Sequence, residues 1–395
     1  MKERFILRDE VFGGALFDRK LLRHKFITRH NEAQLPKEFE HWRAKTENLP
    51  QDILYAPIRV YFETTRFCNL SCRHCFNSSG KKGKGEMTTD QMVKSLVGMR
   101  DDHIFDVRFT GGEFTMRPDW HEILRAGVDL GLAISVNTNS VFENQRVLDR
   151  LASLDLPQIT LSIDGNREHH DFLRGEGNFD KAIANLKTLH EKGSNLRTNT
   201  VVTQHSLADM QEIIELVGPF VAEMNFFYMR PTGRAKKIQD EGVSFEELYQ
   251  FNNLAKELIK KYPGVNIMFG SQVTRANSVQ LNEMGLKIGG PDGFTRFNLL
   301  ADGSMWAGGY SPYIDRAFGL GNIIDENFTL LRVWRESTTL KAFRDFSESL
   351  IRKCMTCQEL DERCSGVNVE MELIRVKNPE TGNPYCQYDQ ENGKG

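Results

Sequence analysis

The sequence predicts an α/β fold built on a parallel sheet or barrel, and two observations support this. Short runs of β-branched and aromatic residues recur along the chain, and segments with helical apolar spacing lie between them. Strands that alternate with helices form parallel sheets, whose ligands bind at the carboxyl ends of the strands. With 395 residues, the chain is long enough for one barrel and additional segments.

The first strand and helix show the pattern clearly. The run IRVYFE at 58–63 predicts a strand. The segment at 88–99 predicts a helix that begins with a capping box from Thr88 to Gln91. The run FDVRFT at 105–110 predicts a second strand, parallel to the first. The same reasoning predicts four further strands, at 133–138, 159–164, 197–203 and 224–229.

A further helix is predicted at 179–193, between two of these strands. Its apolar residues fall on one helical face, at Phe179, Ile183, Leu186 and Leu189. This helix is expected to cover one face of the sheet.

Composition and charge exclude several classes of function. The net charge is −3 and no long basic block is present, so nucleic acid is not an expected partner. The apolar runs are strand-sized and the opening residues MKERFILRDE are charged, which predicts a cytoplasmic protein without a membrane span or export signal. All seven cysteines fall within 68–75 and 354–386, which favours metal ligation over disulfides in a reducing compartment.

Three cysteines, Cys68, Cys72 and Cys75, lie within eight positions. A disulfide would leave one of them over, whereas a metal centre can use all three. They suit an iron-sulfur cubane in which each thiolate binds one iron and the fourth iron stays open. A zinc site completed by His74 is an alternative, but His74 lies directly beside Cys75 and would have difficulty reaching the same ion.

This Cx3Cx2C spacing just after a strand resembles the signature of radical S-adenosylmethionine (SAM) enzymes. The resemblance implies a partial (β/α)6 TIM-like barrel that binds SAM and a 4Fe-4S cluster. In that family the amino and carboxylate groups of SAM chelate the open iron. One electron then cleaves SAM to a 5'-deoxyadenosyl radical, which abstracts hydrogen from the substrate. An electron donor such as flavodoxin or ferredoxin is the expected protein partner.

The second strand ends in FTGGEF, at Gly111, Gly112 and Glu113. This stretch resembles the family's GGE motif, which contacts the amino group of SAM, although two glycines are also typical of a tight turn. The third strand ends at Thr138 and Asn139, which could bond a ribose or cap the next helix.

The fourth strand and the loop after it contain Ser162, Asp164 and Arg174. The resemblance places the first two near the SAM ribose and Arg174 at the SAM carboxylate, a pairing that suits a guanidinium. It also places Arg230, in MRPTGRA, beside the adenosine. From the residues alone, Asp164 could instead belong to a turn, Arg174 could be a surface charge, and Arg230 could belong to a structural Arg-Pro turn. These motifs resemble the branch of the family whose C-terminal extension binds auxiliary clusters.

Four more cysteines follow near the C-terminal end, at Cys354, Cys357, Cys364 and Cys386. Four ligands close a site completely, so a structural zinc fits them. The resemblance favours one auxiliary 4Fe-4S cluster. The fuller extension of this branch, called SPASM, has a further cysteine where this chain has Gly308 and Gly309. The shortened, single-cluster version is known as Twitch.

Three regions are therefore expected: an N-terminal extension at 1–55, a radical SAM barrel at 56–290 and an auxiliary cluster domain at 291–395. Alternation around Gly13 and Gly14 predicts a β-hairpin in the first region. It faintly resembles the start of a peptide-recognition domain, and plugging the bottom of the barrel is the alternative.

The predicted function is radical modification of a ribosomally made peptide, by a crosslink, desaturation or decarboxylation. Modification of a small metabolite and a non-enzymatic iron-sulfur or zinc protein are the alternatives. Oxidation is expected because every cysteine is assigned to a cluster, which leaves no thiol to return a hydrogen atom to the substrate. Tyr310 or Tyr313 could act as the hydrogen donor instead.

Overall fold

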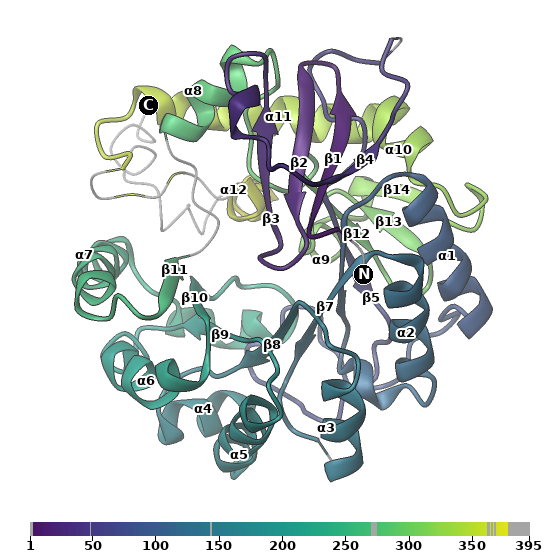
Figure 1. Ribbon diagram of the computed structural model, residues 1–395. Helices are drawn as coiled ribbons and strands as arrows, with labels where there is room; N and C mark the ends of the chain where they lie inside the picture. The colour runs from purple at the N-terminus through teal and green to yellow at the C-terminus, as the bar shows by residue number, and fades with distance from the viewer. Residues whose placement is uncertain are drawn as a thin grey trace.

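The structure is a computed structural model that describes residues 3–47, 49–142, 144–269, 275–361, 364, 366 and 369–377. Within this part of the chain, a curved sheet of ten strands forms the centre (Figure 1). Helices cover its outer side, and a separate sheet of four strands packs at one end.

The central sheet has the strand order β11-β10-β9-β8-β7-β6-β5-β12-β13-β14. The first eight strands in this order are parallel, and β13 and β14 add an antiparallel edge. The strands are β5 (Arg59–Glu63), β6 (Asp106–Thr110), β7 (Ala133–Thr138), β8 (Gln158–Ser162), β9 (Leu196–Val202), β10 (Glu223–Tyr228), β11 (Asn266–Phe269), β12 (Arg296–Leu299), β13 (Ser304–Trp306) and β14 (Gly319–Asn322). All six strands expected from the sequence are present, so the α/β barrel prediction is confirmed.

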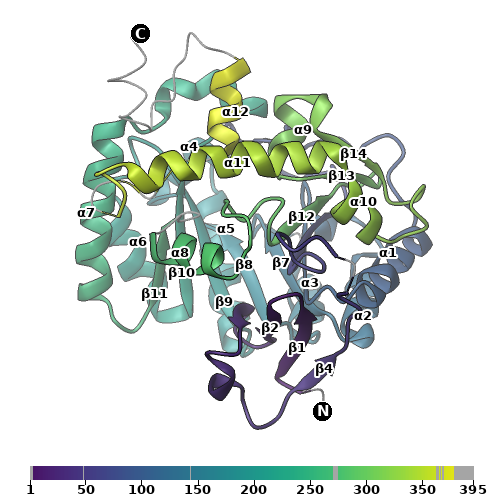
Figure 2. The ribbon, with the colours of Figure 1, turned by 90° about the horizontal axis from the view of Figure 1, so that it is seen from above.

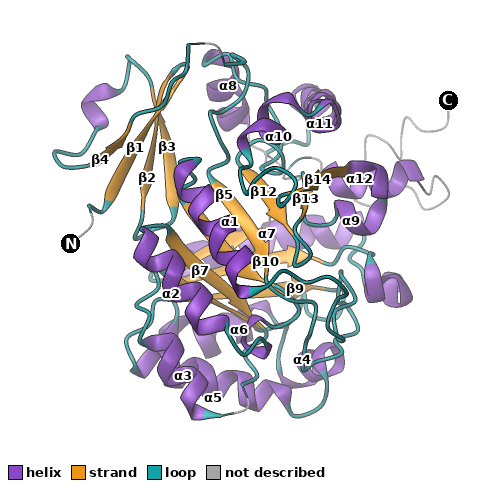
Figure 3. Cartoon of the chain, turned by 90° about the vertical axis from the view of Figure 1, so that its right-hand side faces the viewer, coloured by secondary structure: helices purple, strands orange, loops and turns teal. Residues whose placement is uncertain are grey.

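Helices connect the strands and pack on the outside of the sheet (Figure 3). In the first connection, Thr88 Oγ1 accepts from the amide of Gln91, and the Gln91 side chain accepts from the amide of Thr88, as the capping box predicts. The α-helices are α1 (Thr89–Asp101), α2 (Trp120–Leu130), α3 (Gln145–Ala152), α4 (Arg167–Arg174), α5 (Asn178–Glu191), α6 (Met210–Val217), α7 (Phe245–Lys261), α8 (Arg275–Glu283), α9 (Ser311–Ile314), α10 (Leu331–Glu336), α11 (Thr338–Thr356) and α12 (Val369–Lys377). Among the described residues, none of these helices has the length and apolar character that crossing a bilayer requires.

The N-terminal sheet has the order β3-β2-β1-β4, and its strands are β1 (Phe5–Glu10), β2 (Gly13–Asp18), β3 (Arg23–Ile27) and β4 (Glu40–Trp42). β1 and β2 form an antiparallel hairpin. Phe17 stacks on Phe105, just before β6, with ring centroids 5.1 Å apart. Arg59, the first residue of β5, donates to the carbonyl of Leu22 over 3.1 Å. The sheet therefore lies against the amino ends of the barrel strands.

The C-terminal part of the chain continues the central sheet. β12 pairs with β5 in parallel, and β13 turns back beside it. The indole of Trp334, in α10, donates to the carbonyl of Leu54 over 2.8 Å. The long helix α11 passes across this end of the molecule (Figure 2). The division at residue 291 stays a prediction, and the sheet runs continuously across it.

Candidate functional site

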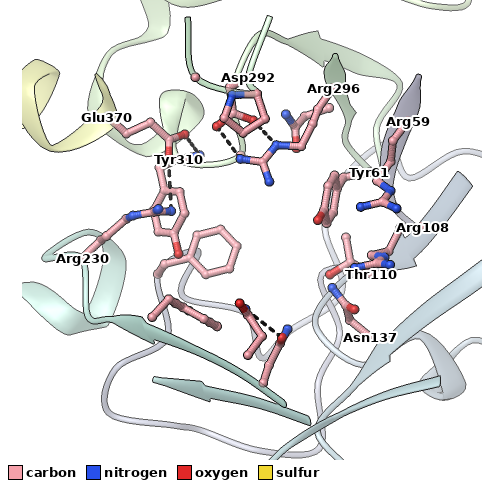
Figure 4. Close-up of a pocket in the computed structure, with 18 of the residues that line it drawn as sticks. Arg59, Tyr61, Arg108, Thr110, Asn137, Arg230, Asp292, Arg296, Tyr310 and Glu370 are labelled. Carbon is pink, nitrogen blue, oxygen red and sulfur yellow. Dashed lines mark hydrogen bonds and ion pairs between the residues drawn. The ribbon is translucent and has the colours of Figure 1, made fainter. Parts of the chain in front are cut away.

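A cavity of about 920 Å³ lies inside the curve of the sheet. Cys68, Cys72 and Cys75 line it beyond the carboxyl end of β5, and His24 of the N-terminal sheet lines it at the opposite end. Figure 4 shows side chains that point into this space from several elements. We call the end near the cysteines the mouth and the end near the amino termini of the strands the floor.

The three N-terminal cysteines lie on one loop that follows β5. They are packed together with Leu70 and Val141, and none of them forms a disulfide. The amide of Cys75 donates to the carbonyl of Cys72 over 3.3 Å, so a tight turn brings these two positions together. Local chain geometry therefore places three thiols on one wall of the cavity.

Polar contacts around the thiols fit metal ligation. Asn139 Nδ2 lies 3.7 Å from Cys68 Sγ and donates to it. Burial raises the pKa of Cys68 to about 11, so its thiol keeps the proton at neutral pH until a metal displaces it. His74 Nε2 lies 3.1 Å from Asp164 Oδ2, so the imidazole is engaged with a carboxylate and does not complete a zinc site with the cysteines.

Within the described part of the chain, no three Cys, His, Asp or Glu side chains surround a point that could hold a single metal ion. Thiols that each bind a different iron of one cluster do not have to converge on one point.

Gly111 and Gly112 follow β6 and lie directly against the cysteine loop. A Cβ at Gly111 would lie 2.7 Å from the carbonyl oxygen of Thr65, and one at Gly112 would lie closer still to that of Phe67. The amides of Gly112 and Glu113 donate to these two carbonyls over 2.7 and 2.8 Å. Only glycine allows this approach, and both glycines also line the cavity.

Glu113 is buried and ties two loops together. Its carboxylate accepts from Thr138 Oγ1 over 2.9 Å, from the amide of Asn139 over 2.8 Å and from Thr115 Oγ1 over 3.0 Å. Burial raises its pKa, although these hydrogen bonds oppose the shift. The described residues that line the cavity do not include Glu113. In this geometry it holds Asn139 beside Cys68.

Ser162 and Arg174 line the cavity, and Asp164 lies behind them. The carboxylate of Asp164 accepts from Arg174 Nε over 2.5 Å and from the amide of Val201 over 2.8 Å. Burial alone would raise the pKa of Asp164, but the charges of Arg174 and His74 hold it well below its usual range. Asp164 therefore stays ionised and orients Arg174 toward the cavity.

Arg230 also lines the cavity, on the side opposite β5 (Figure 4). Its Nη1 donates to Glu370 Oε2 over 3.2 Å, and its guanidinium lies 4.3 Å from the centroid of the Tyr310 ring. Glu370 Oε1 accepts from the amide of Tyr310 over 2.8 Å. A Cβ at Gly308 would lie 2.6 Å from Glu370 Oε1. A buried carboxylate thus lies beside the position where the resemblance expects a further cysteine.

The described C-terminal cysteines are Cys354, Cys357 and Cys364, and Cys386 lies outside the described residues. Cys354 is in the last turn of α11, and the amide of Cys357 donates to its carbonyl over 3.0 Å. Burial raises the pKa of Cys364, and the neighbouring Cys357 adds to the shift. Burial raises the pKa of Tyr228, which lines the cavity, to about 12, and the nearby Cys364 adds to the shift, so Cys364 lies near the barrel interior.

A set of inward-facing side chains was missed by reasoning from the sequence. These residues line the floor of the cavity from four strands, and they are Arg59, Tyr61, Arg108, Arg197 and Arg296. Figure 4 shows Arg59, Tyr61, Arg108 and Arg296. A signal was present, because strands of buried parallel sheets are usually continuous apolar runs and these contain arginine. Arginine within IRVYFE, FDVRFT and RTNTVV marks positions that face a polar interior.

Comparison with known proteins agrees with this geometry. Residues 62–217 match the model of the radical SAM superfamily. The chain is 33% identical over 190 residues to the mycofactocin maturase MftC of Mycobacterium ulcerans, a match covering 48% of this chain and 52% of that protein. The chain thus spans about half the length of this relative. It is 27% identical to the AdoMet-dependent heme synthase of Methanosarcina barkeri, covering 84% of this chain and 97% of that protein.

Solved structures share the fold at lower identity. SuiB of Streptococcus suis, bound to the precursor peptide SuiA, superposes with a TM-score of 0.75 at 17% identity, over 94% of this chain and 96% of that one. anSMEcpe with bound AdoMet superposes with a TM-score of 0.61 at 17% identity, over 77% of this chain and 87% of that one.

Proposed function

Since residues 62–217 match the model of the radical SAM superfamily, we propose that this chain is an enzyme that starts radical chemistry on a peptide substrate. One observation carries the proposal: Cys68, Cys72, Cys75 and Arg174 line the mouth of a single enclosed space. A cluster held by the three thiols and a carboxylate bound by Arg174 would therefore lie in the same cavity.

The residues at the mouth fit the two cofactors of this family. Cys68, Cys72 and Cys75 would hold a 4Fe-4S cluster with one open iron. When bound, the cluster and SAM supply a 5'-deoxyadenosyl radical that can abstract hydrogen from a substrate. Arg174, oriented by Asp164, binds the carboxylate of SAM through its remaining guanidinium donors.

The other predicted contacts take smaller roles. The backbone at Gly111 and Gly112 forms the wall beside SAM, and Glu113 acts through Asn139. Ser162 faces the cavity near the ribose, and Arg230 closes the side nearest the C-terminal segment.

A peptide substrate is supported by the maturase MftC among the relatives and by the fold of SuiB, whose structure holds a precursor peptide. A small-molecule substrate is the second candidate, supported by a heme synthase that matches this chain over 97% of its own length. The cavity volume of about 920 Å³ admits a few peptide residues or one such molecule.

The proposed reaction is a net oxidation of the substrate. All seven cysteines are assigned to the two clusters, so no spare thiol returns a hydrogen atom. Cys354, Cys357 and Cys364, with Cys386, would hold an auxiliary cluster that accepts the released electron. Tyr310 and Tyr313, two of the four tyrosines that line the cavity within the described residues, could donate hydrogen instead.

The cofactor chemistry is tested with the full chain after anaerobic reconstitution with iron and sulfide. Incubation with SAM and a chemical reductant should yield 5'-deoxyadenosine. A fully loaded protein that forms none would overturn the proposed function.

The substrate is then sought by adding cell extract in deuterated water and searching for a mass-shifted peptide or metabolite. A product lighter by two hydrogen atoms supports oxidation. An unchanged formula with one solvent deuterium at an α-carbon would show epimerisation and contradict it.

A further inference from the structure

Four arginines meet at the floor of the cavity, and we call Arg59, Arg108, Arg197 and Arg296 the arginine cluster. They come from β5, β6, β9 and β12. Figure 4 shows the Tyr61 ring between Arg296 and the pair formed by Arg59 and Arg108. The cluster lies at the amino ends and middles of the strands, away from the cysteine loop beyond their carboxyl ends. It is therefore separate from the residues proposed to hold SAM.

Three members of the cluster have carboxylate partners. Arg59 pairs with Asp106, Arg197 Nη1 lies 2.9 Å from Glu223, and Arg296 Nε lies 2.8 Å from Asp292. Their charges are each matched by one carboxylate, as buried guanidinium groups require.

Arg108 differs from the other three. Its Nε donates to Ser135 Oγ over 3.0 Å and its Nη2 to Gln158 Oε1 over 2.9 Å, and both acceptors are neutral. It is 2% exposed, and within the described part of the chain its side-chain hydrogen bonds go to these two neutral groups, while Asp106 acts on it only as a nearby charge. A buried cation without a directly paired carboxylate is costly, so the site favours an added anion.

The surroundings carry a surplus of positive charge. Nine Lys and Arg side chains and four Asp and Glu side chains line the cavity within the described residues. Asp106, Asp164 and Glu223 do not line it but neutralise Arg59, Arg174 and Arg197 from behind, so the surplus is smaller than the lining side chains alone suggest. Arg197 Nε is buried and has no acceptor among the described residues. The floor of the cavity therefore offers an unused hydrogen-bond donor in addition to positive charge.

The ionisable groups respond to this surplus. Burial, together with the nearby charge of Arg59, lowers the pKa of Arg108 to about 10. Burial alone would raise the pKa of Tyr61, but the four arginines bring it down to about 7. Both shifts show a site that stabilises negative charge.

We propose that the arginine cluster binds a carboxylate group of the substrate, with Arg108 as the specificity-determining cation. Within the described residues Arg108 is the one member of the cluster without a paired carboxylate. While Tyr61 keeps its proton, one cation is left over, which matches a singly charged carboxylate better than a phosphate group carrying about two charges. A planar carboxylate also fits the fork of guanidinium donors. That the bound group belongs to the substrate rests on the proposed function, whereas anion binding itself does not.

The test uses the full chain with benzoate as the probe, benzamide as a neutral molecule of similar shape, and inorganic phosphate. Binding is measured by calorimetry on the wild type, on R108Q and on R167Q, in which an exposed arginine paired with Asp180 is changed. We expect benzoate to bind the wild type and R167Q equally, and R108Q at least about tenfold more weakly. Benzamide should not bind.

Equal binding of benzoate and benzamide, or undiminished binding by R108Q, would overturn the proposal. Tighter binding of phosphate than of benzoate would overturn the choice of carboxylate. If R108Q does not fold, the pKa of Tyr61 is measured instead, by following tyrosinate absorbance in the wild type with and without benzoate and using Y61F to identify the Tyr61 signal. A bound carboxylate must raise this pKa. An unchanged pKa at saturating benzoate contradicts the proposal.

These outcomes are independent of cofactor chemistry. A wild type that forms no 5'-deoxyadenosine but binds benzoate through Arg108 would defeat the proposed function and keep the anion site. A chain that forms 5'-deoxyadenosine but does not bind benzoate would defeat the anion site and keep the proposed function.

Discussion

Asp164 accepts a hydrogen bond of 2.5 Å from Nε of Arg174, at the point where the fourth barrel strand opens into its loop. The same carboxylate lies 3.1 Å from Nε2 of His74, the residue beside Cys75. A fully buried anion thus links the cysteine loop to the arginine proposed to bind SAM. Through this carboxylate, a change in the cysteine loop after β5 would alter the orientation of Arg174, which follows β8.

The first prediction concerns this pair. Asp164→Asn keeps the shape of the side chain but removes the charge that orients Arg174, so SAM should bind about tenfold more weakly because a charge-assisted hydrogen bond is lost. Calorimetry on the reconstituted protein measures this, with iron content expected to stay unchanged. D180N, which changes an exposed ion pair with Arg167, is the control and should bind SAM normally. Unchanged affinity in D164N would exclude the positioning role.

The second prediction separates the two cysteine groups. Replacing Cys68, Cys72 and Cys75 together by Ala should remove about four irons per chain and abolish 5'-deoxyadenosine formation. Replacing Cys354, Cys357 and Cys364 together should also remove about four irons but leave some SAM cleavage. Iron and zinc analysis with product chromatography measures both effects. Zinc in place of the second set of irons would make the C-terminal site structural and end its electron-transfer role.

The third prediction tests why glycine occupies position 308. A Cβ there would lie 2.6 Å from Glu370 Oε1 and would push this carboxylate away from Arg230. We expect Gly308→Ala to destabilise the protein by about 1 to 3 kcal/mol, as overpacking a buried site does. Thermal unfolding measures the change. Gly264→Ala is the control, because a Cβ at Gly264 meets nothing within 4 Å. Equal melting temperatures for the two variants would contradict the contact.

The fourth prediction is a pH effect at Tyr61, whose pKa of about 7 lies below its usual value of about 10. The phenol of Tyr61 therefore loses its proton at a lower pH in the folded state than in the unfolded state. The stability that Tyr61 contributes is therefore fully present above about pH 10 and is lost as the pH falls toward 7. Denaturant unfolding of the wild type and Y61F across this range measures the difference. One tyrosine of the wild type, absent in Y61F, should also ionise near neutrality by absorbance. Parallel stability profiles for the two proteins would refute the shift.

Several features follow from short stretches of sequence. The capping box between Thr88 and Gln91 and the helical face through Leu186 and Leu189 depend on residues within a few positions of one another. The six expected strands are likewise local runs, and each is found in the central sheet. The Cx3Cx2C loop is local too, so the spacing of its cysteines is enough to assign the three thiols to one site.

The role of Glu113 shows where that reasoning ends. The resemblance to the GGE motif predicts that Glu113 contacts the amino group of SAM, and this stays a prediction. In the structure its carboxylate accepts from Thr138 Oγ1 and from the amide of Asn139. Those partners lie on the next strand, and sequence alone does not show which way a carboxylate turns at the end of its own strand. The same holds for Glu370, whose neighbour at Gly308 lies on a distant segment.

The sequence by itself determined the α/β alternation, the cysteine loop and the order of the motifs, because propensity, capping and ligand spacing act over a few residues. Only the tertiary structure decided that, among the described residues, Arg108 bonds to the neutral Ser135 and Gln158 while Arg59, Arg197 and Arg296 each have a carboxylate partner. Those pairings depend on the register of parallel strands far apart in the chain, and on which side chains face the cavity once the sheet curves. Local sequence patterns carry neither the register nor the curvature, so the charge of the cavity floor could be known only after folding.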